Sequence, residues 1–243
     1  IDQSIIDNNL KEGKPYRAWL RSKAKYLESS LYNYAGSGIK LISPKDLNMA
    51  SKYFMLYSEE RQSVIRPLAM DSSEGTGSMG DDTALAVVSS MPRQIYDFFR
   101  QQFAQVTNPP IDSLRESAVM SLETCFGPEL NIFEETPEHA NRIVTSSPVL
   151  SHKKLKTLLK SKRFKSQEFK LIFSKSETLK NALIKLGDKV KSAVKRGNIL
   201  IHLIEEMPGD NKLSINALLA TGYIHQQLIN EGLRTDANII VST

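Results

Sequence analysis

The last third of the chain alternates short apolar runs with longer amphipathic runs, and this order constrains the fold more than any other feature. Residues 177–196 and 215–232 repeat apolar side chains at helical spacing, and Gly197 can end the first of these helices. The apolar runs around them, each as long as a buried strand, are 169–173, 199–204 and 237–241. This order predicts an α/β fold with a mostly parallel sheet and βαβ units over residues 165–243.

The first part of the chain is more irregular. Residues 1–13 are polar and lack a period, which is typical of an incoming linker. A domain of residues 14–243 is expected to follow, with a helical part at 14–70 and a loop-rich region at 71–122. The helical part contains a predicted helix from Pro15 to about residue 30. Two further helices are expected to start at Ser43-Pro44-Lys45-Asp46, where serine can cap and proline suits the first turn, and at Ser58-Glu59-Glu60.

Two apolar stretches interrupt the loop-rich region. Residues 84–88 have the length and composition of a short buried strand. Residues 92–103 place three phenylalanines at helical spacing, and this spacing favours a core-facing helix over a cofactor site. These phenylalanines are Phe98, Phe99 and Phe103. Pro109 and Pro110 then exclude a helix.

Composition excludes several classes of protein. Hydrophobic residues make up 40% of the chain, enough for a packed core. The single cysteine, Cys125, excludes an internal disulfide and a cysteine-built iron–sulfur cluster, and it is typical of a cytoplasmic protein. The sequence has no run of apolar residues long enough to span a membrane, so no membrane partner is expected. The net charge of +5 comes from basic runs at 153–165 and 185–196, which are typical of solvated helix faces; no nucleic-acid partner is expected.

The sequence contains no assembled catalytic or metal-binding set. Gly75, Gly77 and Gly80 match the spacing of a dinucleotide fingerprint, but a helix precedes them and a strand follows, the reverse of the order that the fingerprint needs. Adjacent carboxylates at Asp81-Asp82 point to opposite sides of an extended chain and cannot easily share an ion. The four histidines lack ligand spacing, and the one in an apolar run, His202, is predicted to be a hydrogen-bonded core residue. Cys125 is predicted to be a free structural thiol, and by itself the chain is expected to catalyse nothing.

Several stretches together resemble one family. They are Gly77-Ser78-Met79-Gly80-Asp81-Asp82-Thr83, the run from Gln102 through Phe103-Ala104-Gln105-Val106-Thr107-Asn108-Pro109-Pro110-Ile111-Asp112, Leu114-Arg115-Glu116, and the terminal Leu233-Arg234-Thr235-Asp236-Ala237. This pattern is similar to the central domain of the large (alpha) subunit of glutamate synthase, bacterial type. The resemblance covers the whole chain and is densest between residues 77 and 122. One departure is Ala84, where the family usually has proline.

The resemblance implies a fold and a role. The fold would be a rudimentary, incomplete TIM-type barrel with an additional N-terminal helical segment. The domain would link the glutaminase domain to the FMN and iron–sulfur synthase domain, and would help to line the ammonia tunnel used to make glutamate from glutamine and 2-oxoglutarate. Met79 and Thr107 are then the candidates for the channel lining. The loops that support them would contain Gly80, Asp81, Asn108 and Pro109.

The same resemblance sets expectations for cofactors and partners. This chain is expected to hold no cofactor, whereas the parent enzyme, an oxidoreductase taken to be NADPH-dependent, would carry FMN, an iron–sulfur cluster and, in its small (beta) subunit, FAD and NADPH. Its partners would be the glutaminase and FMN-binding domains of the same chain, and that small subunit. Two alternatives stay open: a stand-alone α/β nucleotide- or flavin-binding domain, and a basic nucleic-acid-binding module built on the lysines of 153–165.

Overall fold

The computed structural model describes residues 2–27, 43–71, 73, 86–90, 93, 95–99 and 120–243. They belong to two compact units. The first unit comprises Ile1–Gly36 with Met120–Thr243, and the second comprises Ser37–Val119. The N-terminal helices therefore belong with the C-terminal sheet, although a long stretch of sequence separates them.

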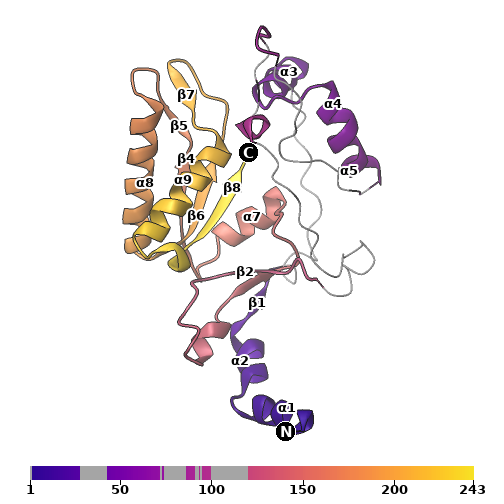
Figure 1. The fold of residues 1–243 in the computed structure, drawn as a ribbon, viewed down its shortest axis with the longest axis vertical. Helices are drawn as coiled ribbons and strands as arrows, with labels where there is room; N and C mark the ends of the chain where they lie inside the picture. The colour runs from indigo at the N-terminus through magenta and orange to yellow at the C-terminus, as the bar shows by residue number, and fades with distance from the viewer. Residues whose placement is uncertain are drawn as a thin grey trace. The chain divides into compact units, whose positions relative to one another are not determined.

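Three parallel strands form the main sheet of the first unit (Figure 1). The strands are β4 (Lys165–Lys170), β6 (Asn198–Ile204) and β8 (Asn238–Ser242). They lie in the order β4-β6-β8, and both neighbouring pairs are parallel. The chain connects them through α8 (Leu179–Lys195) and α9 (Ala217–Asn230). The predicted α/β class with a parallel sheet and βαβ units is confirmed.

Local signals set the ends of the two connecting helices. The Thr178 side chain accepts a hydrogen bond from the Asn181 amide and caps α8. The helix ends just before Gly197, whose φ of +82° lies in the left-handed region that glycine adopts without strain. The Asn216 side chain accepts hydrogen bonds from two amides in the first turn of α9. These caps place the two helices as the sequence predicts.

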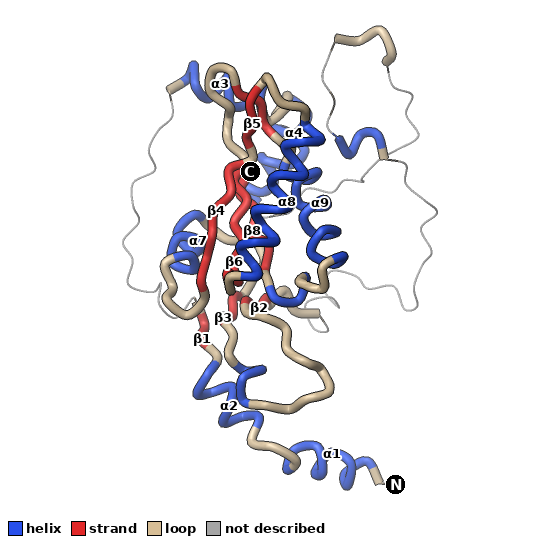
Figure 2. Tube along the Cα trace, turned by 90° about the vertical axis from the view of Figure 1, so that its left-hand side faces the viewer, coloured by secondary structure: helices blue, strands red, loops and turns tan. Residues whose placement is uncertain are grey.

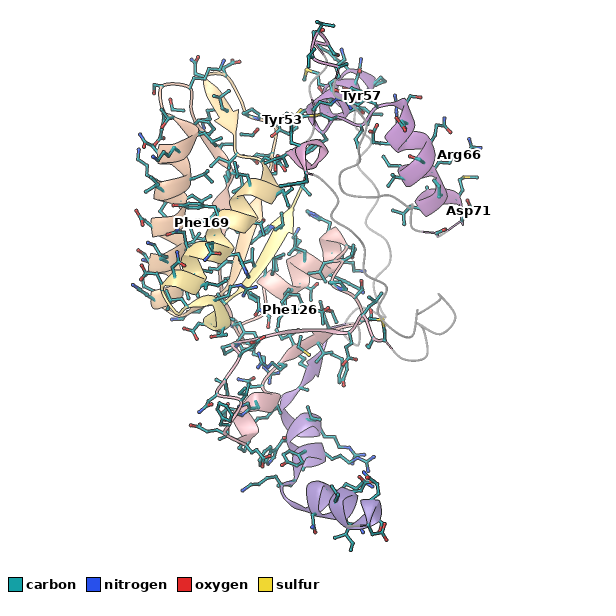
Figure 3. The ribbon with its side chains drawn as sticks, viewed as in Figure 1. Tyr53, Tyr57, Arg66, Asp71, Phe126 and Phe169 are labelled. Atoms are coloured by element: carbon teal, nitrogen blue, oxygen red, sulfur yellow. The ribbon has the colours of Figure 1, made fainter. Side chains whose placement is uncertain are left out.

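Helices cover both faces of the main sheet (Figure 2). On one face, α8 and α9 pack on Ile201 and Leu203 of β6, in a hydrophobic cluster that also contains Phe169 (Figure 3). On the other face lies α7 (His152–Leu159), which is capped by the side chain of Ser151. A second cluster there joins buried leucines of α7 to Leu200 of β6. Alternate residues of β6 thus reach opposite cores, as the two-residue period of a strand requires.

Two smaller sheets complete the first unit. One consists of β1 (Lys25–Tyr26), β3 (Ile143–Thr145) and β2 (Thr124–Phe126), with β1 parallel and β2 antiparallel to β3. The other pairs β5 (Ile172–Ser174) with β7 (Lys212–Ser214). Short 3-10 turns occur at η4 (Pro137–Ala140) and η5 (Arg234–Asp236). The predicted strand at 169–173 is therefore two strands, because the chain leaves the main sheet at Leu171.

The N-terminal segment contacts the rest of the first unit through β1, which pairs with β3. It contains α1 (Gln3–Glu12), which lies within the predicted linker, and α2 (Tyr16–Lys23). The Arg163 guanidinium donates to the Lys23 carbonyl and to Asn141 Oδ1, and Lys23 forms an ion pair with Glu138. The prediction of one helix from Pro15 to about residue 30 is wrong at residues 24–27, and residues 28–30 lie outside the described part of the chain. Pairing with β3 holds Lys25 and Tyr26 extended, and tertiary pairing overrides local propensity.

The described part of the second unit is helical and exposed. Its elements are α3 (Pro44–Tyr53), α4 (Ser58–Glu60), the π-helical turn η2 (Arg61–Ile65), α5 (Arg66–Asp71) and the 3-10 turn η3 (Ile95–Phe98). Ser43 caps α3 as predicted, by accepting a hydrogen bond from the Asp46 amide. No buried residue occurs in α3, α4, η2 or α5. Figure 3 labels Tyr53, Arg66 and Asp71 in these helices.

Two apolar stretches of the second unit do not lie in a core. Val87 and Val88 are in a turn with 93% and 96% of their surface exposed, so the prediction of a buried strand at 84–88 is wrong for them. Phe98 and Phe99 are also exposed, and the prediction that they are core residues is wrong. Phe103 lies outside the described residues. An apolar residue is not always buried by its own fold, because folded proteins keep apolar surface exposed.

Candidate functional site

The residues predicted to line or support a channel lie outside the described part of the chain. They are Met79, Gly80, Asp81, Thr107, Asn108 and Pro109. Their role therefore stays a prediction from the family resemblance. In the first unit, the parallel strands of the main sheet end at one edge. Functional groups in α/β proteins concentrate at this carboxyl edge.

A row of three polar side chains crosses the main sheet near its carboxyl edge. His202 on the central strand is buried, and its Nε2 lies 2.8 Å from Ser242 Oγ on β8. Its Nδ1 lies 3.4 Å from Glu168 Oε1 on β4. The strand register explains the meeting, because Glu168, His202 and Ile240 are paired across the sheet and Ser242 follows Ile240 on the same face. The prediction of a hydrogen-bonded core histidine is confirmed.

Serine, histidine and a carboxylate in this order have the composition of a hydrolytic triad. The sequence does not predict that these three residues meet, because their meeting depends on the register of the strands. The geometry supports a structural role instead. The separation of 3.4 Å between His202 and Glu168 exceeds the range of a base that is firmly oriented by its partner. The His202 side chain is only 6% exposed, so a substrate has little access to its ring. We interpret the three residues as a polar connection between the strands.

Removing this connection has an expected cost. His202→Ala should lower the free energy of unfolding by about 2 kcal/mol, because it leaves a cavity and removes the partner of the Ser242 hydroxyl. Urea unfolding followed by far-UV circular dichroism measures the change. His152→Ala, at an exposed position of α7, is the matched control and should change stability little. Equal stabilities of the two variants would show that the histidine does not hold the strands together.

Acidic groups dominate the residues that follow the strands. Lys170 at the end of β4 forms an ion pair with Glu206 at 2.8 Å. The neighbouring Glu205 accepts a hydrogen bond from the Ala217 amide at the start of α9. With Glu168 nearby, this edge carries more carboxylates than ammonium groups. A phosphate group would be repelled here, so the donor set does not fit the phosphate of a flavin or nucleotide.

A groove of about 740 Å³ lies between β4 and α8. Phe169 and Leu186 contribute apolar surface, and Lys185, Lys189 and Glu177 contribute charge. Lys185 and Glu177 form an ion pair at 2.6 Å. Because its charges of opposite sign neutralise one another in this way, the groove offers no strong preference for an anion or a cation.

Cys125 on β2 is a free thiol at the surface. Partial burial, with a smaller contribution from the Glu123 carboxylate, raises the pKa of the thiol above its usual value, and Arg142 opposes this only in part. The thiolate is therefore less populated at neutral pH than in an unstructured peptide. A raised pKa disfavours a nucleophilic role, in agreement with the predicted structural one.

This electrostatic setting predicts slow alkylation. At neutral pH, iodoacetamide should modify Cys125 more slowly than it modifies glutathione, and the rate should rise as pH increases through the raised pKa. Mass spectrometry of quenched samples measures the rate. Denaturing the chain in urea removes the burial and should restore the ordinary rate, which provides the control. Alkylation of the native chain faster than glutathione would contradict the raised pKa.

The described segments also lack two other kinds of site. They contain no group of three or more histidine, cysteine or acidic side chains placed to hold a metal ion. None of their helices is both long and apolar enough to cross a bilayer. What the structure defines is thus a mixed α/β domain in which no complete catalytic set appears among the described residues.

Comparison with known proteins identifies the family. The model of the glutamate synthase central domain matches residues 49–243. The chain is 39% identical over 235 residues to ferredoxin-dependent glutamate synthase 2, chloroplastic, of Arabidopsis thaliana, covering 94% of this chain and 14% of the relative. It is 33% identical over 246 residues to the glutamate synthase [NADPH] large chain of Azospirillum brasilense, covering 98% of this chain and 16% of the relative.

The chain therefore belongs to the glutamate synthase central domain family. The resemblance stated from the sequence is confirmed. A third relative, the chloroplastic ferredoxin-dependent glutamate synthase of Oryza sativa subsp. japonica, is 35% identical over 249 residues, which cover all of this chain and 15% of the relative. The chain thus spans about 15% of the length of the curated relatives that it matches.

Proposed function

We propose that this chain is the linking domain of a glutamate synthase large subunit. It joins the glutaminase domain to the FMN and iron–sulfur synthase domain, and it helps to line the tunnel that carries ammonia between them. In this proposal Met79 and Thr107 line the channel, and loops with Gly80, Asp81, Asn108 and Pro109 hold them in place. The protein works in the cytoplasm, together with a small subunit, in making glutamate.

The family match is the observation that carries this proposal. It covers residues 49–243, and relatives named glutamate synthase align with nearly the whole chain while extending far beyond it. The chain corresponds to about 15% of the length of such a relative, which leaves room for neighbouring domains in the proposed parent polypeptide. The segments that resemble the family most densely, between residues 77 and 122, include both proposed channel residues.

Exposed apolar side chains support a linking role. In the second unit they occur on each helical run, at Leu47, Leu68 and Met70, and in the turns at Val88 and Phe98. Among these helices, α3, α4, η2 and α5 have no buried residue. Apolar side chains left exposed by a fold can pack against another protein surface when they gather into a patch. Neighbouring domains of the same polypeptide would cover them.

The sheet supports the further proposal that the fold is a rudimentary barrel. Three parallel strands joined by two helices repeat the βα unit of a TIM-type barrel, and the order β4-β6-β8 leaves the sheet open among the described strands. The N-terminal helices would then be additions to this barrel. The carboxyl edge carries the acidic groups of Glu168, Glu205 and Glu206 in place of a phosphate site.

Cofactors of the parent enzyme would bind outside this chain. A single cysteine cannot supply the thiolates of an iron–sulfur cluster. The acidic carboxyl edge of the sheet does not fit a flavin phosphate. The FMN and the cluster are therefore assigned to the synthase domain, and FAD and NADPH to the small subunit.

Measuring the size of the natural polypeptide tests the linking role. An antibody raised against this chain should detect a band several times larger than 27.3 kDa in source-cell lysate. That polypeptide should purify with flavin and iron. A band near 27.3 kDa without flavin would mean a free-standing domain and would refute the proposal.

A further inference from the structure

A small aromatic pocket lies between α2 and the turn η4 of the first unit. Its volume is about 290 Å³, at the lower end of the range for small-molecule sites. Tyr16, Trp19 and Leu20 of α2 form one side. Their two aromatic rings meet edge to face, with centroids 5.6 Å apart and planes at 81°. A pocket of this size fits one amino-acid side chain better than a cofactor.

The other side of the pocket is acidic. Glu134 and Glu135 lie at its rim, and among the residues that line it there is no lysine or arginine. The Glu135 carboxylate next to the Tyr16 hydroxyl raises the pKa of Tyr16. A carboxylate has lone pairs that can accept from several donors. The pocket thus places two carboxylates beside aromatic side chains, in a chain with a net charge of +5.

Hydrogen bonds hold the acidic side in place. His139 Nδ1 lies 3.3 Å from the Thr136 amide nitrogen and 3.0 Å from the Thr136 hydroxyl. The other ring nitrogen lies 3.0 Å from the Asn131 carbonyl and donates to it. The Asn131 side chain in turn donates to Glu134 Oε1 at 3.0 Å. These hydrogen bonds connect His139, Asn131 and Glu134 on one side of the pocket.

The same turn presents two exposed apolar side chains. Ile132 and Phe133 follow Asn131 directly and have 84% and 89% of their surface exposed. The Phe133 amide donates to Asn131 Oδ1, and the Glu134 amide donates to the Asn131 carbonyl, which fixes the turn. A fixed turn with two exposed apolar side chains loses little conformational entropy on binding. Aromatic side chains beside a pocket are typical of the centre of a protein interface.

We propose that this surface binds a protein segment that inserts an arginine side chain into the pocket, with apolar neighbours against Ile132 and Phe133. The guanidinium stacks on the Trp19 indole and donates hydrogen bonds to the glutamates at the rim. Charge complementarity selects this occupant, since aromatic faces and carboxylates both attract a planar cation. The inference does not depend on the proposed ammonia channel.

The chain provides its own probe, because Trp19 is its single tryptophan. An acetylated and amidated leucine-arginine-leucine tripeptide should change the Trp19 fluorescence saturably. The same tripeptide with citrulline, which keeps the shape and removes the charge, should bind at least about tenfold more weakly. Equal responses to the two tripeptides, or no response at millimolar concentration, would overturn the proposal.

Matched variants separate the two parts of the surface. Glu135→Gln should weaken binding of the arginine tripeptide by about tenfold, because the substitution removes the charge of the side chain and keeps its shape. Binding of the citrulline tripeptide should stay unchanged. Glu129→Gln, an exposed glutamate that does not line the pocket, is the control and should change neither. Phe133→Ala should weaken the binding of both tripeptides by the same factor. Failure of Glu135→Gln to discriminate between them would refute the assigned role of the rim.

A second copy of the chain could compete for the same surface. Size-exclusion chromatography with light scattering measures this, and the proposal predicts a monomer at the concentrations used for fluorescence. A dimer that dissociates in the Glu135→Gln variant would assign the surface to self-association and overturn the proposal.

Discussion

Replacing Thr107 by tryptophan in the whole glutamate synthase polypeptide should uncouple glutamine hydrolysis from glutamate synthesis. The indole is much larger than the threonine side chain and would obstruct a channel at this residue. Glutamate formed from glutamine should fall by about tenfold or more, equivalent to an added barrier of about 1.4 kcal/mol. Synthesis from added ammonia should persist, because external ammonia does not need the channel. Parallel assays of glutaminase, glutamine-dependent and ammonia-dependent activity measure these effects.

The control for Thr107→Trp is Thr107→Ser, which keeps the hydroxyl and reduces the volume. It should leave all three activities close to those of the unaltered enzyme. If the tryptophan variant also kept all three activities, Thr107 would not line the channel. If it lost ammonia-dependent synthesis as well, the substitution would have damaged the synthase domain, and the specific effect on transfer would be refuted.

The regular part of the fold could be predicted because its signals are local and agree with one another. For α8 the spacing of apolar residues and the stop at Gly197 indicate the helix that the structure contains. For β6 the apolar run is nearly the whole strand, since the strand is buried on both faces. The edge strand β4 was harder, because its first residues are polar and its exposed positions give no apolar run.

Elements that depend on distant contacts could not be predicted. Tyr26 lies in β1 because it pairs with Val144, which is more than a hundred residues away in the sequence. Val88 and Phe98 look like core residues in a sequence, yet this chain leaves them exposed. A sequence does not say whether an apolar residue is covered by its own fold or by another surface.

The candidate sites divide in the same way. The channel residues Met79 and Thr107 come from a family resemblance, since no pattern of local chemistry marks them. The polar connection through His202 depends on strand register, which a single sequence does not fix for separate strands. The aromatic pocket is lined by Trp19 and Glu135, which lie far apart in the sequence. No pattern in the sequence indicated that these two residues would meet.

The central strand gives the largest expected effect on stability. Leu203 of β6 is fully buried between the sheet and its covering helices, and strands pair with β6 on both sides. Leu203→Ala should lower the free energy of unfolding by about 3 kcal/mol, because it removes buried apolar surface and leaves a cavity that packed neighbours cannot fill. This loss should accelerate amide hydrogen exchange in β6 by about a hundredfold.

Hydrogen exchange is the suitable measurement because it reports on the first unit separately from the second. Leu218→Ala on α9 is the matched control: its leucine is 48% exposed, so truncation should change stability by no more than about 0.5 kcal/mol. If exchange in β6 were accelerated equally by both variants, burial of Leu203 would not be the cause. If neither variant changed it, the cluster between the sheet and its helices would not determine the stability of this unit, and the main sheet would have to depend on contacts with the rest of the polypeptide.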